Sequence, residues 1–131
     1  MMLLDTSGLY SYFDKDDLYH VKAVKYFDAS VSMLINDYVL AEFIPLCLVR
    51  GLHREKTLAF VEEILLSPFI EKIWTTELNY LEALNLLKTR SDKTYSLCDA
   101  ASFILMRQYE IVEALTTDKH FEQEGFVRLL K

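Results

Sequence analysis

Residues 1–8 read MMLLDTSG, a short apolar run that stops at Asp5 and is followed by turn-forming residues. An apolar run of this length with a polar break predicts a buried strand that leads through a turn into a helix. Four more short segments of this kind follow along the chain: VSMLI at 31–35, FIEKIW at 69–74, IVEALTT at 111–117 and FVRLL at 126–130. The first eight residues therefore predict the strand-then-helix unit from which the rest of the chain is built.

The segments between these strands have the spacing and end residues of helices. We expect helices at 16–29, 38–50, 54–66, 77–90 and 97–109, and a short turn after Asp118. Alternating strands and helices are typical of an α/β fold with a parallel sheet. The sequence therefore predicts a mainly parallel five-stranded sheet flanked by helices on both faces, with ligands bound at the carboxyl ends of the strands.

An apolar stripe runs through the first expected helix. Leu18, Val21, Val24 and Phe27 recur every three residues within 16–29. This spacing places them on one helix face, which we expect to cover a face of the sheet.

Helix ends are predicted from capping residues. The expected N-terminal caps are Asn36-Asp37, Thr75-Thr76 and Ser96, and Gly51 is an expected stop. Pro45 lies inside the second expected helix and lacks the N–H that would bond the carbonyl of Ala41, so a kink or an irregular turn is expected there.

Composition favours one folded domain over residues 1–131. Hydrophobic residues make up 52% of the chain, and only three glycines and two prolines are present, which argues against disorder and against a sandwich of short strands. No apolar run approaches the roughly 18 residues of a membrane span, so a soluble, cytoplasmic protein is expected. Cys47 and Cys98 lack the spacing of a zinc site, and we expect buried free thiols.

The net charge of −6 and the pI of about 5.0 count against a nucleic-acid partner, because phosphate binding usually needs a basic surface. The bases are unevenly placed, however, and local patches can bind what the net charge repels. Two clusters stand out: Arg50, His53, Arg54 and Lys56, and Lys88, Arg90 and Lys93.

Four acids lie at the ends of expected elements. Asp5 and Asp118 close strands, Glu42 lies near the start of a helix that follows a strand, and Asp99 lies in the first turn of its helix. Strand ends and the starts of the following helices share one edge of a parallel sheet. Asp99 precedes its strand, so its place at this edge assumes that its helix also begins there.

Each acid also has a purely structural interpretation. Asp5 and Asp118 can cap turns or short helices, and Asp99 can complete a capping box with Ser96. Glu42 has apolar neighbours at helical spacing, and an unpaired carboxylate in such surroundings costs several kcal/mol. We therefore expect a cation or a proton to compensate the charge of Glu42.

Clustered carboxylates repel one another unless a hard divalent ion such as Mg²⁺ or Mn²⁺ lies between them. Such an ion activates water for in-line attack on phosphorus and stabilises charge on the phosphoryl oxygens. The acids therefore favour phosphodiester hydrolysis. The chain has no GxGxxG and no GxxxxGK[ST] motif, which leaves dinucleotide oxidoreductases and P-loop enzymes poorly supported.

In order and spacing, four segments together resemble the PIN-domain family, and within it the VapC-type toxins of toxin–antitoxin pairs. They are MLLDTSGLYSYFD at 2–14, VLAEF at 39–43, SDKTYSLCDAASFILM at 91–106 and ALTTDKHFEQEGF at 114–126. The resemblance implies a ribonuclease with a parallel sheet and an acidic Mg²⁺ or Mn²⁺ pocket. It places Asp5, Glu42, Asp99 and Asp118 at the positions of the metal-binding acids.

The resemblance further implies a homodimer and a cognate antitoxin that inserts a peptide over the pocket. Thr6, Ser7 and Thr116 lie beside the acids in the sequence and either orient the carboxylates or serve as ordinary turn hydroxyls. Pro45 departs mildly from the family pattern near Glu42.

Histidines and aromatic residues are given structural roles. Packing or capping is expected for His20, His53 and His120 rather than metal ligation, because oxygen-rich sites suit hard cations. Core and rim positions, rather than base stacking, are expected for Tyr10, Tyr12, Phe13, Tyr26 and Phe27.

Two other functions fit an α/β domain with acids at strand ends. A signalling receiver domain would need a phosphorylatable Asp at the end of the third strand, where this chain has Trp74-Thr75-Thr76. A catalytically inactive PIN-like module that binds RNA or a protein is disfavoured because all four acids are present. A cleavage assay distinguishes the inactive module from a nuclease.

Overall fold

The computed structural model describes residues 1–131, which form five strands and seven helices. The strands are β1 (Met2–Leu4), β2 (Met33–Asn36), β3 (Ile70–Ile73), β4 (Glu113–Leu115) and β5 (Val127–Arg128). The helices are α1 (Thr6–Phe13), α2 (His20–Ala29), α3 (Asp37–Val49), α4 (Arg54–Leu66), α5 (Glu77–Thr89), α6 (Leu97–Gln108) and α7 (His120–Gln123).

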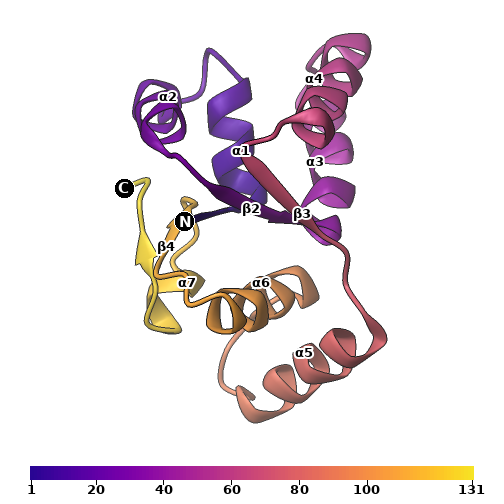
Figure 1. Cartoon of the computed structure of the whole chain (residues 1–131), viewed down its shortest axis with the longest axis vertical. Coiled ribbons are helices and arrows are strands. Elements are labelled where there is room, and N and C mark those ends of the chain that lie inside the picture. The colour runs from indigo at the N-terminus through magenta and orange to yellow at the C-terminus, as the bar shows by residue number, and fades with distance from the viewer.

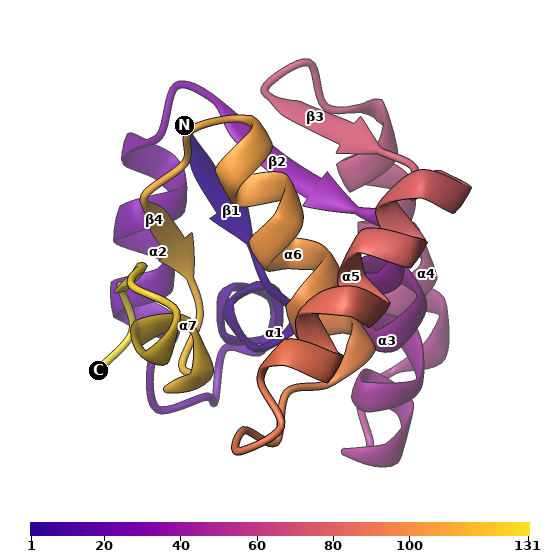
Figure 2. The same ribbon diagram turned by 90° about the horizontal axis from the view of Figure 1, so that it is seen from below.

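The sheet has the strand order β3-β2-β1-β4-β5, and every neighbouring pair is parallel. The predicted α/β fold with a parallel five-stranded sheet is therefore confirmed. β1 lies at the centre, between β2 and β4 (Figure 2). Because all strands point the same way, their carboxyl ends meet at one edge.

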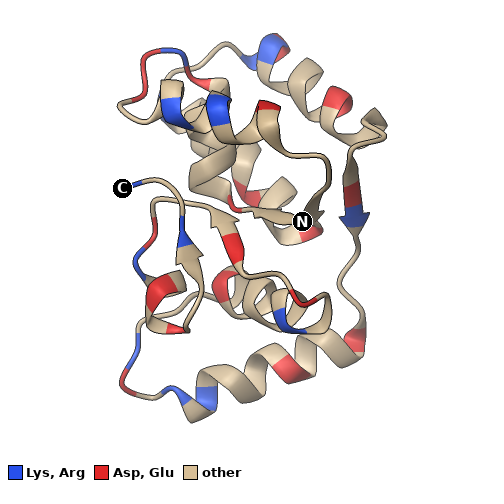
Figure 3. Ribbon diagram, turned by 60° about the vertical axis from the view of Figure 1, so that its left-hand side comes forward, with Lys and Arg blue, Asp and Glu red and all other residues tan.

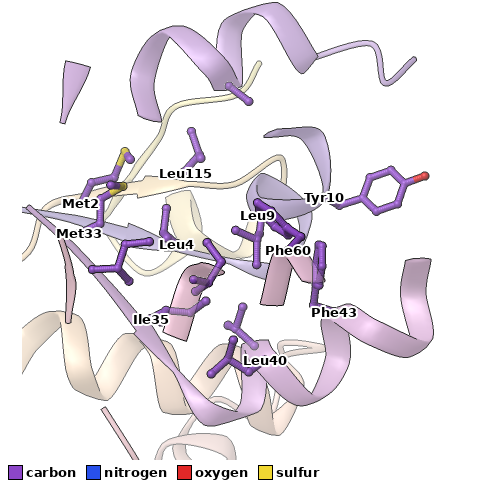
Figure 4. Close-up of a cluster of buried hydrophobic side chains, with 14 of the residues drawn as sticks. Met2, Leu4, Leu9, Tyr10, Met33, Ile35, Leu40, Phe43, Phe60 and Leu115 are labelled. Atoms are coloured by element: carbon purple, nitrogen blue, oxygen red, sulfur yellow. The ribbon is translucent and has the colours of Figure 1, made fainter. Parts of the chain in front are cut away.

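Helices cover both faces of the sheet, with α1 to α4 on one side and α5 and α6 on the other (Figure 1). Alternate strand residues point to opposite faces, so Leu4 and Ile35 belong to the core under α1 to α4, whereas Leu3 and Leu34 belong to the core under α5 and α6. Figure 4 shows the first of these cores, where Leu4 and Ile35 lie with Phe43 of α3. The sheet is therefore buried on both faces.

The segment predicted as one helix over 16–29 differs from expectation. α2 begins only at His20 and is preceded by a separate helix, α1. Leu18 and Val21 are 88% and 82% exposed, and Ala23 is the one fully buried residue of α2. α2 packs mainly against α1, where Phe27 stacks on Tyr12. The predicted stripe is therefore confirmed at Phe27 and wrong at Leu18 and Val21.

Three predicted caps are confirmed. The side chains of Asn36, Thr76 and Ser96 accept the backbone N–H groups of the residues three positions later. α3 is a continuous helix through the exposed Pro45. It ends just before Gly51, as predicted, and the φ of Gly51 is 81°. Glycine adopts this left-handed conformation without a steric penalty.

Both cysteines are buried free thiols, as predicted. Burial raises the pKa of the Cys47 thiol to about 11. No helix of this chain combines the length and the hydropathy that crossing a bilayer requires.

Candidate metal centre

A pocket of about 560 Å³ contains all four predicted acids, Asp5, Glu42, Asp99 and Asp118. It lies where β1 and β4 end and where α1, α3 and α6 begin. The four acids therefore converge at the carboxyl edge of the sheet, as predicted. The assumption about Asp99 also holds, because α6 begins at this edge.

Asp5 follows β1 directly and is 5% exposed. It occupies the N-cap position of α1, but its side chain makes no capping hydrogen bond, so the helix-capping interpretation of Asp5 is wrong. Instead, the Thr116 hydroxyl donates to Oδ2 at 2.7 Å. Burial raises the pKa of Asp5 to about 7, the Thr116 hydrogen bond opposes this shift, and the charge of Asp99 adds to it.

Hydroxyl groups join the ends of β1 and β4. Thr116 Oγ1 accepts the backbone N–H of Asp118 at 3.0 Å while it donates to Asp5, and Ser7 Oγ lies 3.1 Å from the same hydroxyl. Ser7 Oγ also accepts the N–H of Thr117. The fit is close, because a Cβ added at Gly8 would lie 1.8 Å from the carbonyl oxygen of Leu115. Thr116 and Ser7 both donate to Oδ2 of Asp5 and also accept backbone N–H groups, so they orient the carboxylate and serve as turn hydroxyls, the two roles predicted for them.

Asp99 both caps its helix and faces the pocket. Its carboxylate accepts the Ser96 N–H at 3.1 Å, and the Ser96 hydroxyl accepts the Asp99 N–H, which completes the predicted capping box. The same Oδ2 atom lies 3.0 Å from Nδ1 of His120. Burial raises the pKa of Asp99, and the hydrogen bonds from Ser96 and His120 oppose this shift.

Asp118 likewise has a structural contact and a place in the pocket. Its Oδ1 accepts the backbone N–H of His120 at 2.9 Å, which ties the residue to the first turn of α7. The same oxygen is 3.4 Å from Nδ1 of His120. Structural and functional interpretations are therefore compatible for Asp99 and Asp118.

Glu42 is exposed to solvent, which contradicts the expectation that its surroundings are apolar. Its apolar neighbours in the sequence, such as Val39 and Phe43, point into the core, whereas the carboxylate accepts the Thr6 hydroxyl at 2.8 Å and lines the pocket. Glu42 therefore has no buried carboxylate that needs a compensating charge, whereas Asp5 has one.

One candidate cation group stands out. Asp99, Asp118 and His120 each offer a ligand atom within 4.8 Å of the other two. Asp5 and Glu42 lie outside this group but line the same pocket, and the charges of Asp99 and Asp118 raise the pKa of Asp5. Carboxylate oxygens suit a hard divalent cation, which would also relieve this repulsion. The donor set therefore fits a metal ion.

Comparison with known proteins identifies the family. The PIN domain family model matches residues 2–126 of the 131. The chain belongs to the PIN domain family. A comparison with curated proteins finds no match.

Two solved structures have the same fold as this PIN domain. VapC20 of Mycobacterium tuberculosis, described as a sarcin-ricin loop cleaving toxin, superposes with a TM-score of 0.91 at 26% sequence identity, with all of both chains covered. FitAcB from Neisseria gonorrhoeae has a TM-score of 0.68 at 18% identity, with 100% of this chain and 97% of that chain covered. The second match shows the fold alone.

The basic residues of this PIN domain are distributed over several elements (Figure 3). Of the first predicted cluster, only Arg50 lines the pocket, where its guanidinium lies 4.5 Å from the centre of the Tyr10 ring. In the second cluster, Arg90 is bound to Glu124, a carboxylate that also pairs with Arg107. Glu124 therefore offsets part of the charge of Arg90, and Lys93 pairs with Asp92, so the second cluster is a weaker patch than predicted.

Predictions for the histidines and aromatic residues are mostly confirmed. His53 caps α4 by accepting the N–H of Lys56. Tyr10 is buried, and the partly buried Tyr12, Phe13 and Phe27 pack against the same core, whereas Tyr26 is exposed.

His120 and Asp17 are ionisable pocket residues that were not predicted as part of the site. His120 was expected to pack or cap, but its ring lies against two acids of the pocket. Its position two residues after Asp118 was the available signal. Asp17 also lines the pocket, and nothing in its sequence context indicates this.

Proposed function

We propose that this protein is a metal-dependent endoribonuclease that hydrolyses RNA phosphodiester bonds and is the toxin of a VapBC-type toxin–antitoxin pair. The observation that carries the proposal is the gathering of Asp5, Glu42, Asp99 and Asp118 around one pocket at the carboxyl edge of the sheet. The proposal takes residues 1–131 as one PIN domain and places it in the cytoplasm, where its RNA substrate is found.

These four acids are proposed as the catalytic and metal-binding residues. The chemistry that Mg²⁺ or Mn²⁺ supplies when bound is activation of water and stabilisation of charge on the phosphoryl oxygens. Asp99 and Asp118 lie within mutual reach as ligands. Asp5, held by Thr116, adds a third carboxylate whose charge is costly until a cation offsets it.

Glu42 is the exposed member of the four acids, and its carboxylate accepts the Thr6 hydroxyl. A solvent-facing carboxylate at the rim can accept a hydrogen bond from water at the scissile phosphate or reach the cation directly. Glu42→Gln distinguishes these two roles. Lost cleavage with unchanged Mn²⁺ affinity would assign Glu42 to proton transfer, and weakened Mn²⁺ affinity would assign it to cation binding.

RNA must approach a pocket that is strongly acidic. Five acids line it (Asp5, Asp17, Glu42, Asp99 and Asp118) against a single arginine, Arg50. Arg50, which lies over the Tyr10 ring in the same pocket, is the proposed contact for an RNA phosphate and would offset part of the net charge of −6.

A cleavage assay tests the function. Purified protein with Mg²⁺ or Mn²⁺ is given a sarcin-ricin loop hairpin, chosen because VapC20 is described as cleaving it, and an unstructured RNA. Cleavage that EDTA and Asp118→Asn abolish, and that Asp28→Asn leaves intact, supports the proposal. Asp28 is an exposed acid of α2 outside the pocket.

The catalytically inactive module is the alternative outcome. RNA binding without cleavage under every metal condition would favour it. Cleavage that persists undiminished in Asp5→Asn, Asp99→Asn and Asp118→Asn would assign the activity to a contaminant or another site.

Partners complete the proposal. The likeness to the toxin VapC20 supports the proposal of a cognate antitoxin. The exposed apolar residues Trp74, Leu78 and Leu81 provide a surface for a homodimer or another protein contact. Sedimentation of the purified protein measures its oligomeric state, and a neighbouring small reading frame that encodes a DNA-binding protein would supply the antitoxin to test.

A further inference from the structure

His120 faces two acids of the pocket. It is the first residue of α7, and its side chain is 24% exposed at the pocket. Its Nδ1 atom is 3.0 Å from Oδ2 of Asp99 and 3.4 Å from Oδ1 of Asp118. One ring nitrogen therefore faces both carboxylates.

The other ring nitrogen already has a partner. Nε2 lies 3.2 Å from the hydroxyl of Thr94, and the ring packs edge-on against Tyr95. A neutral imidazole carries a single N–H. In the cation-free protein Nδ1–H donates to Asp99. With the proton on Nε2 and donated to Thr94 instead, Nδ1 presents a lone pair to the space that it shares with two carboxylate oxygens.

We infer that His120 binds the divalent cation through Nδ1, together with Asp99 and Asp118. This inference rests on the proposed function, because the cation is the one that the nuclease would use. Neighbouring ligands on an octahedral ion with bonds of roughly 2.1 Å are separated by roughly 3 Å, and the two distances from Nδ1 are 3.0 and 3.4 Å. Thr94 supplies the hydrogen bond to the second nitrogen that metal-bound histidines usually have.

A mixed set of one imidazole and carboxylates changes the metal preference. Imidazole suits transition metals, whereas Mg²⁺ prefers oxygen ligands alone. The structure therefore assigns to His120 a selectivity for Mn²⁺ over Mg²⁺, which differs from the purely oxygen-rich centre that the four acids alone would form.

Pulsed electron paramagnetic resonance of bound Mn²⁺ tests this assignment directly, because a coordinated nitrogen modulates the Mn²⁺ signal. The parent protein, His120→Gln and His53→Asn are compared. His53 caps α4 outside the pocket, and asparagine retains its capping ability. Nitrogen modulation is expected in the parent and in His53→Asn and should be absent in His120→Gln.

Calorimetric titration with Mn²⁺ and with Mg²⁺ provides the second readout. His120→Gln is expected to lower the ratio of Mn²⁺ to Mg²⁺ affinity by roughly tenfold. An equal loss for both ions, without nitrogen modulation in the parent, would show that His120 only positions Asp99, and would overturn the assignment. Modulation that survives in His120→Gln would overturn it as well.

The two proposals fail in different ways. If Mn²⁺ binds in the pocket without nitrogen coupling, the His120 assignment fails and the nuclease proposal stands. If neither ion binds to the parent protein, both fail.

Discussion

Replacing Asp5 by asparagine is expected to stabilise the cation-free protein at neutral pH, although Asp5 is a proposed metal ligand. Burial raises the pKa of this carboxyl group from 3.8 to about 7. The folded chain therefore keeps the proton of Asp5 over a pH range in which the unfolded chain has already released it. Because the folded state binds the extra proton, its stability falls as the pH rises through this range.

The size of the effect follows from the two pKa values. Each pH unit between about 4 and about 7 lowers the free energy of unfolding by about 1.4 kcal/mol, so about 3 kcal/mol is lost between about pH 5 and about pH 8. Asparagine does not titrate, and its amide oxygen can still accept the Thr116 hydroxyl. The free energy of unfolding of Asp5→Asn minus that of the parent should therefore be about 3 kcal/mol larger at about pH 8 than at about pH 5.

Urea unfolding followed by circular dichroism, with EDTA present across this pH range, measures the effect. Asp28→Asn makes the same chemical change at an exposed position and should give a curve parallel to that of the parent. Saturating Mn²⁺ should make the parent more stable than Asp5→Asn, because the parent gains more stability from binding the cation than Asp5→Asn does. Parallel stability curves for the parent and Asp5→Asn in EDTA would refute the burial argument.

Three other substitutions test separate parts of the structure. Gly8→Ala brings a Cβ within 1.8 Å of the Leu115 carbonyl oxygen and should cost about 3 kcal/mol or more of stability; an unchanged melting temperature would contradict the close fit of α1 against β4. Thr116→Val removes the hydroxyl that holds Asp5 and should weaken Mn²⁺ binding roughly 10- to 100-fold in calorimetry. Thr116→Ser should bind Mn²⁺ as the parent does. Equal Mn²⁺ affinities for both variants would show that the hydroxyl does not support cation binding. Arg50→Ala should weaken RNA binding at all sequences and reduce the salt slope by about 1. A matching loss in Lys25→Ala, at an exposed position of α2 outside both basic clusters, would show that the effect is not local.

The order of strands and helices could be predicted because each strand is a short apolar run bounded by polar residues. Helix α1 could not, because Thr6, Ser7 and Ser11 face the pocket and interrupt the apolar period by which a helix is recognised. The stripe of Leu18 and Val21 was misleading for a related reason. Periodicity identifies an amphipathic face but not the neighbour that covers it.

The site shows the same limit. Asp5 and Asp118 could be placed together because both end strands of one parallel sheet, and this depends only on topology. The exposure of Glu42 depends on how α1 and α3 leave the pocket open, which local spacing does not contain. The contacts of His120 with Asp99 join residues 21 positions apart, so only the folded chain brings them together.

The central claim is that the acids at the carboxyl edge hold a divalent cation. Anomalous diffraction from a crystal soaked in Mn²⁺ at a concentration that supports cleavage locates that ion directly. The account predicts a single strong peak in the pocket at a bonding distance of roughly 2.2 Å from Asp99 and Asp118, with Asp5 in contact directly or through one water. A peak elsewhere on the molecule, with none among these carboxylates, would contradict it.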